Sequence, residues 1–260
     1  MNRSTTLASS AALSLSALFH AQASEPVTAI DQMSALAGSV SPGDAPGFPI
    51  TLSRSGHYKL TSNLVVPADT SGIVINAPNV VLDLAGHSIT GPVRCSHDAA
   101  ARSVACDAAS KFSAVVGISS VGAAGAVLRN GVVKGFAGLG VHYGEGTVLD
   151  NLQVLANAGV GIAGAGYATA GLLRAVLVKH NGGPGIVCEH MRIERSTFAA
   201  NGGTGVDCRG SWFVGSVTRH NGGYGVAEGS KYGLRSFDNR LGDEVGVAAD
   251  RLPVVVDAKR

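Results

Sequence analysis

A short glycine-rich pattern recurs at a fixed spacing and constrains the fold of this chain more than any other feature. Asn-Gly-Gly-x-Gly followed by an aliphatic residue begins at Asn181, Asn201 and Asn221, 20 residues apart, and a looser copy begins at Asn157. A run typical of a β-strand precedes each copy, and such a unit is too small to bury a core alone. Copies stacked at the strand spacing of about 4.8 Å bury a continuous apolar column. The repeat therefore predicts a solenoid.

The length of the repeat selects among solenoids. About 20 residues per coil without a helical segment fit an all-β fold, a single-stranded right-handed parallel β-helix, whereas the Leu-x-x-Leu-x-Leu pattern of leucine-rich repeats is missing. Composition agrees, because glycine supplies 36 of 260 residues and charged residues only 15%. These values disfavour a coiled coil, a helical bundle and a highly charged disordered chain.

In such a stack, residues at equal places in successive coils lie one above another. One inward aliphatic row is predicted to contain Val141, Ile162, Ile186, Val206, Val226 and Val247. A second is predicted to contain Leu128, Leu149, Leu173, Ile193, Phe213 and Leu234. The residues after the second row point outward and alternate in charge along most of the row: Arg129, Asp150, Arg174, Glu194, Val214 and Arg235. We interpret them as solubilising pairs, and the stacked Asn181, Asn201 and Asn221 as a structural ladder.

The chain divides into four segments. Residues 1–23 combine a basic start, an apolar stretch and an Ala-Gln-Ala motif, which predict a signal peptide and a periplasmic or secreted protein. Residues 24–50 are expected to form an N-terminal helical cap, because apolar residues there recur at helical spacing. The β-helix is expected over 51–250 with a loop insertion at 92–113, followed by a C-terminal strand and tail over 251–260. The helical spacing involves Val27, Ile30, Met33, Leu36 and Val40.

The charge balance bears on partners. Removing Arg3 with the signal peptide lowers the 20 Lys and Arg residues to 19, against 18 acidic residues. A nearly neutral chain does not favour a nucleic acid partner, and the apolar runs after residue 23 are too short for membrane insertion. We expect a monomer.

Four cysteines, an even number in an exported chain, predict two disulfides. Cys188 and Cys208 are one coil apart, which falls inside the Cα separation of roughly 4.4 to 6.8 Å that a disulfide bridges. Cys95 and Cys106 bracket the insertion and are expected to close it into a loop. Both disulfides are interpreted as structural.

Four segments carry a family resemblance: GDAPGFPITL at 43–52, GHYKLT at 56–61, LVVPA at 64–68 and NVVLDLAGHSITG at 79–91. They resemble exported bacterial right-handed parallel β-helix proteins, a functionally mixed group with the architecture of pectate lyases, polygalacturonases and uronan epimerases. The catalytic motifs of the polygalacturonases and the epimerases are absent, and we find no fitting pair of carboxylates. The resemblance therefore implies a fold and assigns no catalytic residue.

A basic edge is the main candidate site. Lys179-His180 and Arg219-His220 each precede an Asn-Gly-Gly turn, two coils apart, and we expect one His to act as base and a neighbouring cation to stabilise an enolate. Further residues are expected on the same side as substrate-binding groups: Lys134 and Arg240 in the register of Lys179, and Arg94, His97 and Arg102 in the insertion. His142 and Tyr143 form a second candidate acid–base pair.

Two functions follow as hypotheses. The first is recognition of an acidic polysaccharide along the basic edge, with lyase-like β-elimination as the candidate reaction. The alternative is a non-catalytic exported or surface-associated scaffold, which the missing carboxylate pair and the 5% content of aromatic residues favour. No cofactor and no metal site are predicted, with calcium left open.

Overall fold

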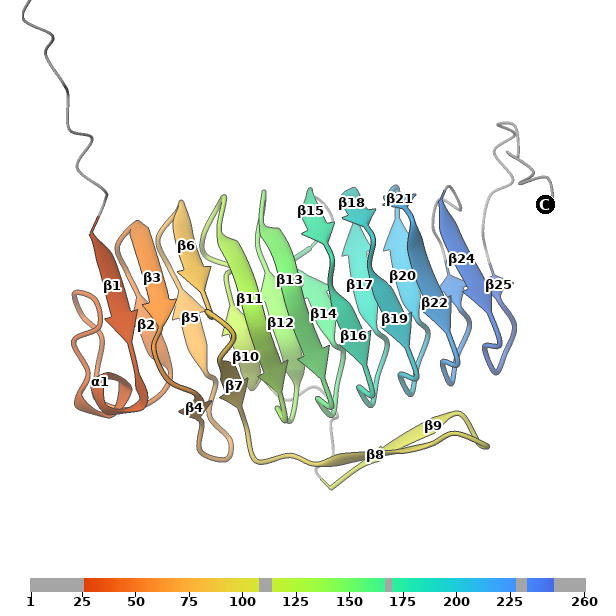
Figure 1. Cartoon of the computed structure of the whole chain (residues 1–260), viewed down its shortest axis with the longest axis horizontal. Helices are drawn as coiled ribbons and strands as arrows, with labels where there is room; N and C mark the ends of the chain where they lie inside the picture. The colour runs from red at the N-terminus through yellow and green to blue at the C-terminus, as the bar shows by residue number, and fades with distance from the viewer. Residues whose placement is uncertain (1–25, 108–113, 167–169, 228–232, 246–260) are drawn as a thin grey trace, which may run out of the picture.

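The computed structural model describes residues 26–107, 114–166, 170–227 and 233–245. Within them the chain is a parallel β-solenoid, in which strands of successive coils lie side by side along one long axis (Figure 1). Helix α1 (Gln32–Ala37) is the one helix of these residues. The prediction of an all-β parallel solenoid is confirmed. The expected signal peptide, the expected C-terminal strand and tail, and Val247 lie outside the described residues.

Two parallel sheets form the walls of the solenoid. The larger sheet has 14 strands: β1 (Val27–Ile30), β3 (Gly56–Leu60), β4 (Leu64–Val65), β6 (Val80–Asp83), β7 (Ser88–Thr90), β11 (Val127–Lys134), β13 (Val148–Leu155), β15 (Gly171–Arg174), β16 (Leu177–Lys179), β18 (Met191–Glu194), β19 (Thr197–Ala199), β21 (Trp212–Val214), β22 (Ser216–Arg219) and β24 (Leu234–Phe237).

The smaller sheet has nine strands: β2 (Ile50–Leu52), β5 (Ile73–Ile75), β10 (Val116–Ser119), β12 (Leu139–Tyr143), β14 (Ile162–Gly164), β17 (Ile186–Glu189), β20 (Val206–Arg209), β23 (Val226–Ala227) and β25 (Glu244–Val245). Strands β8 (Cys95–Asp98) and β9 (Ser103–Cys106) pair with each other as an antiparallel hairpin outside both sheets.

The strand register confirms most of both predicted inward rows. Val141, Ile162, Ile186, Val206 and Val226 pair in that order and are buried, so each coil contributes one aliphatic side chain to a continuous core. The second row pairs in the same way from Leu128 to Phe213. Burial of these apolar rows supplies the main driving force for stacking.

The predicted register fails in the last coil. Leu234 pairs with Ser216 rather than with Phe213, and Arg235 pairs with Val217 rather than following Val214. Glu244 pairs with Val226, the place that the sequence assigned to Val247. The cause is a change of coil length, because the paired positions Val226 and Glu244 are 18 residues apart whereas Val206 and Val226 are 20 apart.

Two columns of left-handed residues mark corners of the coils. The first column divides the larger sheet lengthwise and consists of Asn130, Asn151, Ala175, Arg195 and Gly215, with φ between 45° and 62°. The second follows the strands that end at Lys134, Leu155, Lys179, Ala199, Arg219 and Phe237, and it includes Ala156, His180, Ala200, His220 and Asp238, with φ between 50° and 59°. His180 and His220 therefore occupy corner positions that alanine also fills in other coils.

A buried asparagine ladder follows the second corner. The side-chain N–H of Asn157 donates to Asn181 at 2.9 Å, Asn181 donates to Asn201 at 3.0 Å, Asn201 to Asn221 at 3.1 Å, and Asn221 to Asn239 at 2.9 Å. Each accepting oxygen also takes a backbone N–H from the previous coil. The predicted ladder is confirmed and extends by one asparagine at each end. Its bonds satisfy polar groups that the stacked turns bury.

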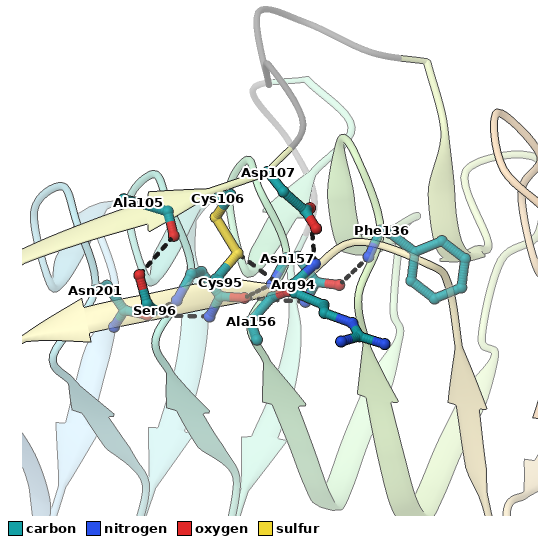
Figure 2. The surroundings of a disulfide bond; sticks show 11 residues. Arg94, Cys95, Ser96, Ala105, Cys106, Asp107, Phe136, Ala156, Asn157 and Asn201 are labelled. Carbon is teal, nitrogen blue, oxygen red and sulfur yellow. Dashed lines mark hydrogen bonds between the residues drawn. A yellow bond between two sulfur atoms is a disulfide. The ribbon is translucent and has the colours of Figure 1, made fainter.

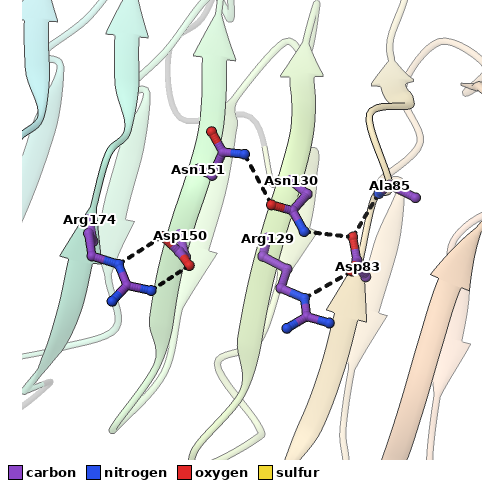
Figure 3. Close-up of polar contacts among 7 residues, drawn as sticks. All are labelled: Asp83, Ala85, Arg129, Asn130, Asp150, Asn151 and Arg174. Carbon is purple, nitrogen blue, oxygen red and sulfur yellow. Dashed lines mark hydrogen bonds and ion pairs between the residues drawn. The ribbon is translucent and has the colours of Figure 1, made fainter.

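The outward charges before the first corner neutralise one another. Arg129 lies 3.0 Å from Asp83, and Arg174 lies 2.7 Å from Asp150 (Figure 3). The hydrogen bond from Arg174 is the main cause that lowers the pKa of Asp150 below its ordinary value. Arg192 lies 2.5 Å from Glu194 of the same strand, β18. These contacts confirm the interpretation of this row as paired surface charge.

The N-terminal region does not form the amphipathic helix that its apolar spacing predicts; it forms a strand and a short helix. Val27 and Ile30 belong to β1, which pairs in parallel with β3. Helix α1 is six residues long and begins at a capping box of Asp31 and Ser34. Met33 and Leu36 are 81% and 55% exposed, so their helical spacing does not create a buried face. Strand formation by the β-branched residues outweighs the periodicity here.

The disulfide between Cys188 and Cys208 is confirmed, with a Cα separation of 4.4 Å across adjacent strands β17 and β20. Both residues are buried, so the bond joins two coils from inside the core. This placement supports the prediction that it is structural.

We expect replacement of Asn201 by Ala to lower the free energy of unfolding by about 3 kcal/mol, because the change leaves several buried ladder partners without hydrogen bonds. Chemical denaturation followed by circular dichroism measures this. The exposed amide of Gln153 provides a matched control, and Gln153→Ala should change stability by less than about 0.5 kcal/mol. An equal loss of unfolding free energy in both variants would contradict the conclusion that the ladder hydrogen bonds stabilise the fold.

Candidate functional site: a basic face beside a disulfide-closed hairpin

The β8–β9 hairpin runs lengthwise along the rod, beside the turns of the C-terminal coils (Figure 1). A disulfide joins Cys95 and Cys106 at its base, with a Cα separation of 4.0 Å, as predicted (Figure 2). Beside it, the backbone N–H of Arg94 donates to the carboxylate of Asp107 at 2.9 Å. Cys95 Sγ lies 3.4 Å from the carbonyl oxygen of Ala156 on the rod. These contacts fix the hairpin base against one coil.

The hairpin approaches three stacked glycines of the Asn-Gly-Gly turns. A Cβ on Gly182 would meet Cys106 Sγ at 3.3 Å, one on Gly202 would meet the Val104 side chain at 3.4 Å, and one on Gly222 would meet the Arg102 carbonyl at 2.6 Å. The same atoms would also overlap the carbonyl of the preceding coil. The second residue of the motif is therefore glycine because two backbones pass on either side of it.

An imidazole stack joins the hairpin to the rod. The rings of His97 and His180 lie 5.0 Å apart between centroids and 20° from parallel. Burial, the nearby Lys179 and His97 itself lower the pKa of His180 from 6.5 to about 4. Burial, Lys179 and His220 likewise lower the pKa of His97, although Asp98 acts in the opposite direction. The pair is therefore uncharged at neutral pH.

His220 has different surroundings. Its Nε2 lies 3.6 Å from the carboxylate of Asp238, and its ring meets Phe237 edge-on with 6.2 Å between centroids. The His220 side chain is 42% exposed, and Asp238 is 59% exposed. The two histidines predicted as alternative bases are thus distinguished by their contacts, because His180 is stacked under the hairpin and His220 is not part of that stack.

The outward surface between the two corner columns carries cations without acids. We call it the basic face; its strand segments are β7, residues 132–134 of β11, residues 153–155 of β13, β16, β19, β22 and β24. None of these described segments contains an Asp or Glu. Its outward cations are Lys134, Lys179, Arg219 and Arg235. The basic face therefore differs from the neighbouring row, where each Arg has a carboxylate partner.

The register on this face confirms one predicted position and corrects another. Lys134 and Lys179 share a row through Leu155. Arg240 does not belong to it, because Phe237 pairs with Arg219 and the Arg240 N–H donates to the Asn221 carbonyl. The short last coil displaces Arg240 by three residues. For the same reason, the place of Phe237 in this row was not predicted.

The three insertion residues that were expected to bind substrate have different surroundings in the structure. Arg94 is exposed at the base of the hairpin, His97 stacks on the rod, and Arg102 has a φ of 49° in the turn between β8 and β9. His97 was predicted to bind substrate, but in the structure its ring stacks on that of His180. Nothing in the sequence alone indicated that stack, since it joins residues 83 positions apart.

The second candidate pair is divided by the strand. Tyr143 is 0% exposed and packs in the core, whereas His142 is its outward neighbour on β12, with a pKa lowered by burial. Successive strand residues point to opposite faces. A substrate in solvent does not reach the Tyr143 phenol, so we do not include this pair in the site.

The described residues contain no group of three or more His, Cys, Asp or Glu side chains that could hold a metal ion. They also contain no helix with the length and apolarity needed to cross a bilayer.

No protein-family model matches the chain. No curated protein and no solved structure matches it either.

The imidazole stack predicts a pH-dependent stability. The pKa of His180 is about 4 in the folded chain and 6.5 ordinarily, so the unfolded chain binds more protons between these values. The free energy of unfolding should therefore fall as pH decreases from about 6.5 to about 4.

NMR titration of the imidazole C–H resonances measures this directly. We expect His180 to titrate near 4 and its pKa to rise toward 6.5 in His97→Ala, which removes the stacked ring. His87→Ala, a histidine outside the stack, should leave the His180 titration unchanged. A His180 midpoint near 6.5 in the intact protein would show that the stack does not form.

Proposed function

We propose that the protein binds an acidic polysaccharide along the basic face, with the sugar chain parallel to the long axis of the rod. The observation that carries this proposal is the set of outward cations on described strands that hold no acidic residue. Positive charge without internal partners attracts anions and raises their local concentration. The adjacent row offers no such field, because its arginines contact Asp83 and Asp150.

The shape of the surface suits a polymer better than a small ligand. The basic face is built from segments of successive parallel strands, so its cations follow one another along the axis. A polymer that follows this axis contacts several of them at once, and weak individual contacts then add. This geometry supports recognition of an extended chain.

We extend the proposal to eliminative cleavage with His220 as the base. A base removes the proton beside the uronate carboxyl group, and a carbon–carbon double bond forms as the bond to the leaving oxygen breaks. That oxygen takes up a proton from water. His180 suits this step poorly, because a pKa of about 4 makes it a weak base at neutral pH. His220 lies beside Asp238, and the adjacent Arg219 provides the cation for the developing enolate.

We also infer that the chain is an exported right-handed β-helix protein closed at its N-terminal end by α1. Two disulfides support an oxidising compartment. The resemblance of segments 43–52 and 79–91 to exported bacterial β-helix proteins supports the handedness and the location.

Binding can be measured by fluorescence anisotropy with labelled polygalacturonate, alginate and hyaluronan fragments, using dextran as the neutral control. We expect saturable binding to at least one acidic chain, weakened by salt. The double variant Lys179→Ala/Arg219→Ala should weaken it about tenfold, since each lost contact costs up to about 1 kcal/mol. Arg192→Ala removes an exposed charge outside the basic face and should have little effect. Affinity unchanged in the double variant would refute the assignment of the face.

Cleavage is read from the ultraviolet absorbance of unsaturated uronate ends in the same mixtures. We expect absorbance to rise with time in the intact protein and to be lost in His220→Ala while binding persists. His180→Ala should retain the reaction. Binding without absorbance on every acidic chain would overturn the cleavage step and favour the non-catalytic scaffold.

A further inference from the structure

The row of the basic face that lies beside the second corner column alternates between cationic and apolar residues. Strand pairing places the following side chains in consecutive coils: Lys134, Leu155, Lys179, Ala199, Arg219 and Phe237. Every second position is a cation, and each position between them is apolar. Within this row the period of positive charge is therefore two coils, while Arg235 lies in the neighbouring row of the same face, in the coil of Phe237.

The intervening positions supply no partner for an anion. Ala199 is 4% exposed between Lys179 and Arg219, and its methyl side chain has no hydrogen-bond donor. Leu155 is partly buried between Lys134 and Lys179. Phe237 is 40% exposed and presents a ring to solvent. A carboxylate placed against these residues would lose water without gaining a hydrogen bond, which is unfavourable.

The coil spacing relates this pattern to a sugar chain. Adjacent parallel strands lie about 4.8 Å apart, so neighbouring cations of the row are about 10 Å apart at their Cα atoms. An extended pyranose chain advances by about one strand spacing for each sugar. The cations therefore meet every second sugar. The sugars between them lie over Leu155, the buried Ala199 and Phe237, of which Leu155 and Phe237 present apolar surface to the uncharged face of a sugar ring.

We propose that the ligand is an acidic polysaccharide with one carboxylate on every second sugar, as in chains that alternate a uronate with an uncharged hexosamine. This inference rests on the proposed function and specifies the class of polymer bound at the same face. A polyuronate with a carboxylate on each sugar satisfies the same cations but places its remaining carboxylates against apolar side chains. The row therefore selects by charge period as well as by charge.

The test compares end-labelled octasaccharides that differ in charge period. Hyaluronan and unsulfated chondroitin carry a carboxylate on every second sugar, and oligogalacturonate carries one on every sugar. We expect at least one alternating octasaccharide to bind the intact protein about tenfold more tightly than oligogalacturonate, the equivalent of one unpaired carboxylate. The use of two alternating probes separates charge period from the identity of the hexosamine.

A variant that changes the period should change the preference. Leu155→Lys places cations in three consecutive coils, so we expect oligogalacturonate to gain affinity and the tenfold preference to shrink to about threefold or less. Trp212→Lys adds the same charge at an exposed position outside the basic face, and it should change both affinities alike. Its measurement corrects for the general effect of added charge.

The outcomes separate the two proposals. Oligogalacturonate binding as tightly as the alternating chains, or an equal response of both ligands to Leu155→Lys, overturns the inference on charge period and leaves polysaccharide binding intact. Absence of binding to all three octasaccharides, together with the same result for longer acidic chains, overturns the proposed function itself.

Discussion

Register between stacked coils is the constraint on which the rest of this structure depends. Each coil pairs with its neighbours through parallel backbone hydrogen bonds, and the buried asparagines from Asn157 to Asn239 add a side-chain connection at every coil of that series. A slip by one residue would turn every apolar side chain outward and unpair the ladder. Because register is fixed in this way, residues about 20 positions apart in sequence become neighbours in space.

Register also gives the two halves of the larger sheet different electrostatics. Before the first corner, opposite charges fall on adjacent strands and pair, as Asp150 and Arg174 do. After the corner, Lys179 and Arg219 are separated by Ala199 and have no acid on the described strands around them. The same stacking thus pairs the charges on one half of the sheet and leaves a net positive charge on the other half, where the ligand is proposed to bind.

The hairpin modifies that face without joining the sheet. It contacts the rod through glycine turns, through Cys95 near Ala156, and through the rings of His97 and His180. The stack partly buries both imidazoles, and this burial together with the nearby Lys179 lowers the pKa of each. A hairpin held in this way lies beside the cations and makes His180 a weak base at neutral pH, which is why the proposed reaction uses His220.

Sequence alone predicted the features that repetition determines. The asparagine ladder, the first inward row and the bond between Cys188 and Cys208 all follow from a constant offset. The predicted register of Leu234 and Arg240 was wrong because the last coil is shorter than the others. A repeat of constant length does not indicate where that length changes.

Other features depend on contacts between distant segments. The stack of His97 on His180 and the exposed Met33 of α1 were not predicted, since neither is set by local spacing. The basic face itself was within reach, because reading outward positions between the two corners shows four cations and no acid. Lys134, Lys179 and Arg219 were predicted on one basic edge because they lie beside turns, whereas Arg235 was assigned to the row of alternating charge.

The register of the basic face can be measured by pulsed electron spin resonance. Spin labels at Lys134→Cys and Arg219→Cys are specific because all four native cysteines form disulfides. Four strand spacings separate the two positions, so the account predicts a narrow distribution centred near 19 Å between backbones, plus the reach of the labels. A broad distribution, or a centre far from that value, would contradict the stacked register and with it the row of cations.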